Sequence, residues 1–318
     1  MNDARPPWPE LPPPDAWADT FATVHMWTQV VGKIRLELSP WLNHSWGSAL
    51  HVTANGLTTS PVPAGAGSFD IEFDFAHHAL RIRRSDGRER GFPLSPMSVA
   101  DFHQRVMAAL AELDIAVSIF MRPVEVVDAI PFEQDHVHAS YDADTVNRVW
   151  RAFAQADRVF KVFRARFQGK SSPSHFFWGS FDLAVTRFSG RGAPLHPGGA
   201  PNCADWVMQE AYSHELASAG FWPGAGFGEA AFYAYAWPEP AGYRERSVQP
   251  AAARFSESLQ EFVLPYEAVR SAGDPDATLL AFLQSTYESA ADLAHWDRAS
   301  LERDGSWPGH GARHMSGV

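Results

Sequence analysis

The chain has 318 residues, of which 45% are hydrophobic and 20% are charged, and its formal net charge is −11 at pH 7. An acidic surface repels polyanions, so we expect no nucleic-acid partner. No apolar run approaches the roughly 18 residues that a membrane-spanning helix needs, so we expect no membrane partner either. The apolar fraction is enough for a substantial core.

The chain has one cysteine, Cys203, which lies between Asn202 and Ala204. An intrachain disulfide is therefore impossible, which is typical of a reducing compartment. We interpret Cys203 as a small loop residue rather than a catalytic thiol. The N-terminus lacks a basic region followed by an apolar stretch, so it does not look like a signal peptide, and we expect a cytoplasmic protein.

Residues 1–14 are rich in proline, and we expect a loosely packed arm there. Residues 15–122 are expected to form a first α+β half. Apolar periodicity, with Asp15 and Ser98 as helix caps, predicts its elements in this order: a helix over 16–33, strands over 48–54, 68–75 and 79–84, a helix over 98–113 and a strand over 115–121.

The strand expected over 68–75 alternates between apolar and acidic residues, with Phe69, Ile71 and Phe73 set against Asp70 and Glu72. Because the side-chain period of a strand is two, this alternation predicts a sheet with one buried and one wet face. The arginines that follow are interleaved with acids, and we interpret them as a solvated hairpin edge.

Residues 123–302 are expected to form a second α+β half with an insertion at 189–228, followed by a flexible tail at 303–318. Asp142 and Gly169 bound its strongest helical pattern. In chain order the patterns predict a helix over 143–168, a strand over 175–188, a helix over 205–218, strands over 230–237 and 259–264, and a helix over 276–295.

We therefore predict an α+β protein with antiparallel sheets flanked by helices. Histidine and Trp-Gly-Ser recur at 43–48 and 174–180, each after a helix. This recurrence suggests an internal duplication, with two related halves about a pseudo-twofold axis. Chance similarity of short strings over a common helix–sheet order is the alternative.

Two segments, 174–182 and 210–215, place ionisable side chains directly beside large aromatic or small apolar ones. This mixture is typical of the wall of a partly buried polar pocket. Glu210 and His214 are four residues apart on the helix expected there, so both would leave one face. With His175 they form a candidate set of divalent-metal ligands, although a surface ion pair explains the spacing equally well.

The candidate catalytic residues are His175, Asp182 and His214, with Asp182 orienting a histidine. Arg187 and Arg191 open into a glycine-rich loop and would bind an anionic group. Pairing of Arg187 with Asp182 or Glu215 is an equally good interpretation. The remaining candidate ligand-binding residues are His138, from the His-x-His string at 136–138, and three aromatics that would exclude water, Trp178, Tyr212 and Trp222.

Several strings resemble a bacterial family of unknown function, the domain of unknown function 5996. They lie at 27–33, 56–61, 138–142, 174–191, 212–215 and 219–224, and the resemblance spans about residues 15–300. The resemblance implies that these strings belong to one functional unit, but it implies no reaction. His136 departs from the family's pattern, which leaves His138 as the histidine of interest.

These patterns lead to three hypotheses. The first is an enzyme that acts on a small, anionic molecule through a His/Glu/Asp pocket with a divalent metal. The second is a non-catalytic protein that binds a small molecule in the same pocket without a metal. The third is a structural polar cluster with no ligand. Gly-x-Ser-x-Gly, His-Glu-x-x-His, Cys-x-x-Cys and dinucleotide motifs do not occur.

Overall fold

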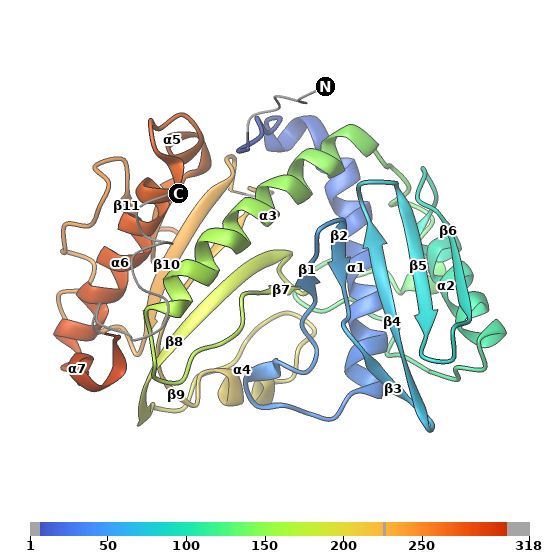
Figure 1. Ribbon diagram of the computed structural model, residues 1–318, viewed down its shortest axis with the longest axis horizontal. Helices are drawn as coiled ribbons and strands as arrows, with labels where there is room; N and C mark the ends of the chain where they lie inside the picture. The colour runs from blue at the N-terminus through green and yellow to red at the C-terminus, as the bar shows by residue number, and fades with distance from the viewer. Residues whose placement is uncertain (1–6, 225–226, 304–318) are drawn as a thin grey trace.

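The structure, a computed structural model, describes residues 7–224 and 227–303. Within these ranges the chain forms seven α-helices and two antiparallel sheets of six strands each, so the expected α+β class is confirmed. The two sheets lie side by side, and the long helix α3 (Ala143–Ala165) crosses in front of the sheet formed by the C-terminal half of the chain (Figure 1). Asp142 caps this helix, as expected, by accepting hydrogen bonds from two backbone amides of its first turn.

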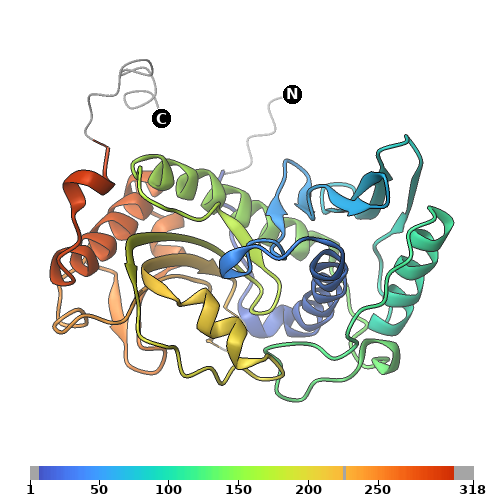
Figure 2. The same ribbon diagram turned by 90° about the horizontal axis from the view of Figure 1, so that it is seen from below.

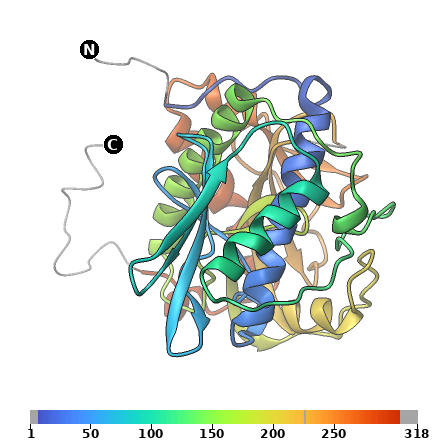
Figure 3. The same ribbon diagram turned by 90° about the vertical axis from the view of Figure 1, so that its right-hand side faces the viewer.

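The first sheet has the order β1-β2-β4-β5-β6, and β3 pairs with β4. Its strands are β1 (His51–Val52), β2 (Gly56–Thr58), β3 (Val62–Ala64), β4 (Gly67–Asp74), β5 (Ala79–Arg84) and β6 (Glu89–Pro93). Helices α1 (Ala18–Leu38) and α2 (Val99–Glu112) lie next to each other against this sheet (Figure 3). Trp27 of α1 stacks on Phe102 of α2 with 4.8 Å between ring centroids, and Phe102 in turn stacks on Phe73. Burial of these rings fixes the helices on the sheet.

The first turn of α1 and that of α2 are capped differently. Ser98 accepts a hydrogen bond from the amide of Asp101, as predicted for α2. Asp15 does not cap α1, because it lies inside a short 3-10 helix, η1 (Pro14–Trp17), that precedes α1.

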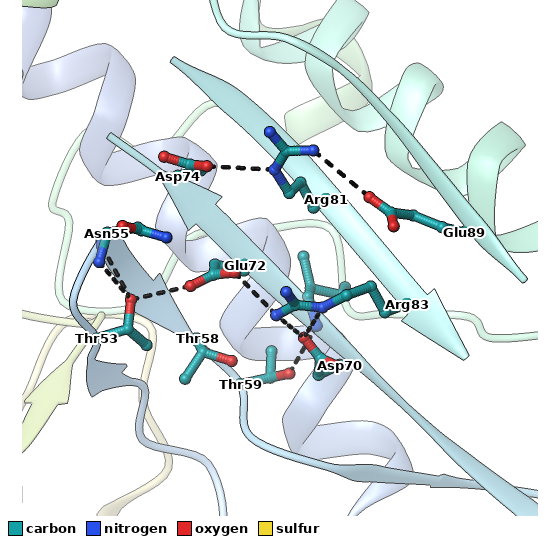
Figure 4. A network of polar contacts seen from close by, with 12 residues as sticks. Thr53, Asn55, Thr58, Thr59, Asp70, Glu72, Asp74, Arg81, Arg83 and Glu89 are labelled. Atoms are coloured by element: carbon teal, nitrogen blue, oxygen red, sulfur yellow. Dashed lines mark hydrogen bonds and ion pairs between the residues drawn. The ribbon is translucent and has the colours of Figure 1, made fainter. Parts of the chain in front are cut away.

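The outer face of the first sheet carries the alternating charges (Figure 4). Arg83 binds Asp70 and Glu72, each at 2.8 Å, and Arg81 binds Asp74 at 3.2 Å. The interleaved arginines are thus neutralised locally. The expectation of a uniformly wet face is wrong in one respect, because Glu72 and Asp74 are only 6% and 2% exposed and depend on these partners.

The second sheet has the order β11-β12-β10-β9-β8-β7. Its strands are β7 (His175–Phe177), β8 (Asp182–Gly192), β9 (His214–Trp222), β10 (Ala231–Trp237), β11 (Arg254–Ser256) and β12 (Glu261–Pro265). Helices α3 and α6 (Pro275–Leu293) cover one face, where Phe153 packs on Phe221 and Phe160 on Phe232. The short helix α4 (Asp205–Ala211) lies on the other side of β8 and β9 (Figure 2). The remaining helical segments are η2 (Asn43–Ser45), η3 (Phe132–Gln134), α5 (Tyr266–Arg270) and α7 (Arg298–Leu301).

Three expected elements are wrong. The strand over 175–188 is a hairpin, since β7 and β8 pair antiparallel across the turn at 178–181. The helix over 205–218 ends at Ala211, and His214 already begins β9. Residues 115–121 form no strand. In the second case β9 pairs with β8 on one side and β10 on the other, and this long-range pairing overrides local helical preference.

The internal duplication is not supported. Asn43–Ser45 forms a 3-10 turn before β1, whereas His175 lies within β7 and Trp178-Gly179-Ser180 forms the turn after it. The two strings thus occupy different structural positions. In addition, the segment expected to be an insertion supplies β9, which pairs with β8 on one side and β10 on the other.

The N-terminal arm is not loosely packed where it is described. Trp8 is 2% exposed, and its indole donates a hydrogen bond to Asp276 at 3.2 Å. The hydroxyl of Tyr266 donates to the carbonyl of Pro9 at 2.7 Å. The prolines predicted a loosely packed arm, but the buried side chain of Trp8 holds this segment against the core. Residues 1–6 and 304–318 lie outside the described residues.

Among the described residues, none of the helices combines the length and apolar character that crossing a bilayer requires.

Candidate functional site

The face of the second sheet opposite α3 carries a mixture of polar and aromatic side chains. Tyr233 and Tyr235 of β10 point to this face, because Phe232 and Ala234, which alternate with them along the strand, are buried in the core. Strand register places Gly220 of β9 opposite Tyr233. We call this surface the open face, since α3 and α6 cover only the other one (Figure 2).

Asp182, the first residue of β8, lies on the open face beside Tyr233. It is 7% exposed and accepts hydrogen bonds from Ser180 Oγ at 2.5 Å and from the hydroxyl of Tyr233. Burial raises the pKa of Asp182, and the two hydrogen bonds oppose this rise. The Tyr233 ring reaches Asp182 by lying across Gly220, where a Cβ would be only 2.2 Å from the ring. The hydrogen bond therefore requires glycine at position 220.

Two further carboxyl groups, those of Glu125 and Glu261, surround Asp182. Burial, and to a smaller extent the nearby charge of Asp182, raises the pKa of each to about 7. The Glu125 side chain lies against Gly179, where a Cβ would be 2.2 Å from Oε1. Glu125 is exposed to solvent and yet desolvated.

We call Glu125, Asp182 and Glu261 the acidic cluster. Within the described part of the chain, Glu125 and Glu261 form no ion pair. Asp182 thus lies close enough to Glu125 and to Glu261 for its charge to raise the pKa of both. Like charges that lie close together repel one another, and a positive charge between them would relieve this repulsion.

Aromatic side chains continue the site along β10. The hydroxyls of Tyr212 and Tyr235 are 2.8 Å apart and share a hydrogen bond. Burial raises the pKa of Tyr212 to about 12, so its hydroxyl stays protonated at neutral pH. The ring of His196 stacks on Tyr212 at 4.5 Å, and Trp237 also contacts His196. Tyr212 lies near all three carboxyl groups of the acidic cluster, so the aromatic side chains and the carboxyl groups belong to one site.

The expected metal site does not form. Glu210 lies on α4 and accepts a hydrogen bond from Trp41 at 2.6 Å, whereas His214 lies on β9, so no helix presents them on one face. The ring of His214 is 5.8 Å from that of His44, and His175 contacts other residues. Across the described ranges, no three His, Cys, Asp or Glu side chains are placed to hold a metal ion.

His175 is completely buried between Trp46, His51 and Phe177. Neither ring nitrogen has a hydrogen-bond partner among the described residues. Burial lowers the pKa of His175 to about 3, so the ring is neutral at physiological pH. This environment supports the interpretation of His175 as a structural residue.

The two arginines expected to bind an anion have other partners. Arg187 is 1% exposed and faces the core, with its guanidinium 3.5 Å from the ring centroid of Phe163 and 4.3 Å from that of Tyr287. Arg191 binds Glu215 at 2.6 Å and donates to two carbonyls after α6. Asp182 and Arg187 are five positions apart on β8, and an odd spacing along a strand puts two side chains on opposite faces of the sheet. The expected pairing of Arg187 with Asp182 therefore does not form.

Of the other expected ligand-binding residues, two lie on the open face and two lie elsewhere. Tyr212 lies on the site. Trp222 lies on β9 two residues after Gly220, on the same face. Trp178 is 7% exposed, donates to the carbonyl of Ser48 at 2.8 Å and covers Gly32 of α1. His138 binds Asp135 at 2.7 Å within a loop.

Sequence reasoning missed Glu125, Glu261, Tyr233 and Tyr235. The Tyr-Ala-Tyr-Ala-Trp pattern at 233–237 could have identified the two tyrosines. Large aromatic residues alternate there with alanine, which indicates a strand with its alanines on a packed face and its aromatic side chains on the other. No local signal identifies Glu125, which reaches the site from a loop.

The fold and the open face define an α+β protein with an acidic, tyrosine-lined candidate site. A model of the family of unknown function DUF5996 matches residues 8–303, so the chain belongs to this family, as the resemblance of its strings suggested. No curated protein and no solved structure matches the chain.

Proposed function

We propose that the protein binds a small molecule bearing a cationic group at the acidic cluster. The observation that carries this proposal is the clustering of three carboxyl groups without a basic partner among the described residues, next to the tyrosine rings of β10. A bound ammonium or guanidinium group would supply the missing positive charge, and the tyrosine rings would stabilise it further.

This proposal changes the charge expected for the ligand. The sequence predicted an anionic ligand because Arg187 and Arg191 were expected to bind it, and both arginines contact other residues instead. A metal is a weaker candidate than an organic cation, because the described carboxyls are not arranged to coordinate one ion. An organic cation can contact carboxyl groups that are several ångströms apart. The cytoplasm remains the proposed compartment, in keeping with a single cysteine.

The test uses isothermal titration calorimetry with butylamine, pentylamine and hexylamine as probes. Alkylamines stay protonated to about pH 10, whereas Glu125 and Glu261 ionise around pH 7. Binding should therefore strengthen from pH 6 to pH 8 and release protons. Glu125→Gln and Glu261→Gln should each weaken it.

Glu257→Gln is the matched control. It removes one negative charge from an exposed loop residue, so it changes the net charge equally without touching the site. Amine binding that is absent, or that responds equally to all three substitutions, would refute the proposal.

A second candidate function is acid–base catalysis on the same cationic molecule. The hydrogen bond from Tyr233 to Asp182, with Glu125 and Glu261 titrating near neutral pH, is what a general acid and base require. Mass spectrometry of an amine-containing metabolite mixture would test it. Catalysis predicts consumption of one component by the unchanged protein and none by Glu261→Gln, whereas a binding protein would consume nothing.

A further inference from the structure

A lysine and a histidine form a hydrogen-bonded pair outside the acidic cluster. The ammonium of Lys170, between α3 and β7, donates to Nε2 of His44 at 2.6 Å. Nδ1 of His44 lies 2.9 Å from the carbonyl oxygen of Ala211, at the end of α4. A carbonyl only accepts hydrogen bonds and an ammonium only donates them, so His44 carries its hydrogen on Nδ1 and a lone pair on Nε2. The histidine is therefore a base whose lone pair faces the amine.

The surroundings of His44 keep its ring neutral. The residue is only 4% exposed, and burial is the largest cause of its lowered pKa. The charges of Lys170 and His214 lower this pKa further, whereas the hydrogen bond to Ala211 and the charge of Glu210 act in the opposite direction. His44 is thus unprotonated at neutral pH and lies within the distance at which a general base accepts a proton.

Lys170 is placed as a reactive amine rather than as half of an ion pair. Among the described residues it has no carboxylate partner. Its Nζ lies 4.9 Å from the ring centroid of Phe188 and 5.6 Å from that of Trp46. These rings exclude water from part of the ammonium, and this desolvation lowers the pKa of Lys170. The residue as a whole is exposed, so a reactant can approach it from solvent.

The backbone that carries the base has an unusual conformation. His44 and Ser45 have φ angles of +57° and +59°, in the left-handed region that residues with a Cβ rarely adopt. Such conformations persist where surrounding contacts hold them, and they cluster at functional sites. The same residues belong to the string 43–48 that resembles 174–180 in the sequence. The proposed function leaves this string without a role.

We propose that Lys170 is a nucleophile that forms an imine with a small carbonyl compound, and that His44 is its base. The ammonium passes one proton to Nε2 of His44, and the free amine attacks the carbonyl carbon to give a carbinolamine. The protonated His44 returns the proton to the carbinolamine hydroxyl, which leaves as water while the nitrogen lone pair forms the C=N bond. The product is a protonated imine, and no oxidant or reductant is consumed. This inference does not depend on the proposed function.

The first experiment measures the reactivity of the amine in the unchanged full chain. Trace acetylation with acetic anhydride is followed by peptide mass spectrometry from pH 6 to pH 10, with Nα-acetyllysine in the same solution as an ordinary lysine. Lys170 should react about tenfold faster than the reference at pH 7, because each unit by which a pKa falls gives about tenfold more free amine. Its rate should also level off at a lower pH.

The chain supplies an internal control for this experiment. Of its three lysines, Lys161 has a side chain that is 62% exposed and binds Asp157 at 2.5 Å. Lys161 should therefore react no faster than Nα-acetyllysine. A Lys170 rate equal to that of the reference at pH 7 would overturn the proposal.

The second experiment traps the imine. Propanal and sodium cyanoborohydride at pH 7 should attach a propyl group to Lys170 in preference to Lys161. His44→Asn should slow this reaction at Lys170 about tenfold, to the rate of an ordinary lysine, and leave Lys161 unchanged. Asparagine tolerates a positive φ and provides no base.

Three results would contradict the assignment. They are the absence of preferential trapping at Lys170, fast acetylation without a trapped propyl group, and an unchanged trapping rate in folded His44→Asn. If His44→Asn does not fold, the acetylation profile and the trapping in the unchanged protein decide the matter by themselves.

Discussion

The half-buried carboxyl of Glu261 should make the protein less stable as the pH rises from about 4.5 to about 7. Burial raises the pKa of this group from 4.5 to about 7 in the folded chain. Below pH 4.5 the carboxyl is protonated in both states and has no effect. Between the two values the unfolded chain loses its proton while the folded chain keeps it, so the unfolded state is favoured. Above about pH 7 the penalty is complete.

The size of this penalty follows from the shift in pKa. A rise from 4.5 to about 7, at about 1.4 kcal/mol for each pKa unit, corresponds to about 3 kcal/mol. Part of the rise comes from the charge of Asp182, so removing Glu261 also relieves its neighbour. Glu125 is exposed, and solvent screening makes its own contribution smaller.

The assay is urea unfolding of the unchanged protein and of Glu261→Gln at several pH values between 4 and 8. Glutamine keeps the shape of the side chain and cannot ionise. The variant should be more stable by 1–3 kcal/mol at pH 8, estimated from the same shift, and the difference should vanish near pH 4. Glu257→Gln, at an exposed position, should change stability little at any pH. A Glu261→Gln variant that is less stable at pH 8, or a difference independent of pH, would refute the electrostatic reasoning.

The remaining predictions concern residues outside the acidic cluster. Trp8→Ala should lower the free energy of unfolding by about 3 kcal/mol in urea, because a buried indole is lost; a loss below about 1 kcal/mol would mean that the arm does not stabilise the core. Gly220→Ala should displace Tyr233 and weaken amine binding more than tenfold by calorimetry. Gly192→Ala, whose Cβ meets no atom within 4 Å, should have no such effect. His175→Phe should remove the stability loss between pH 6.5 and about pH 3, since the buried neutral ring resists the proton that the unfolded chain accepts; an unchanged acid profile would contradict this reasoning.

Local patterns in the sequence predicted the helices α2 and α3 together with their caps. Asp142 and Ser98 cap α3 and α2, and an apolar stripe continues along each helix. Capping and periodicity depend on residues within a few positions of one another, so they can be recognised without the fold. The α+β class and the membership of the family follow from the same kind of local information.

The tertiary structure decided which of these residues meet. Glu125 reaches the site from a loop, Asp182 begins β8 and Glu261 begins β12, so the acidic cluster exists only because the strands pair as they do. The same pairing makes His214 part of β9 and separates it from Glu210. Burial then sets the chemistry of each group. It makes His175 a neutral core residue and brings Glu125 and Glu261 close to their ionisation point at neutral pH, because desolvation depends on neighbours contributed by distant parts of the chain.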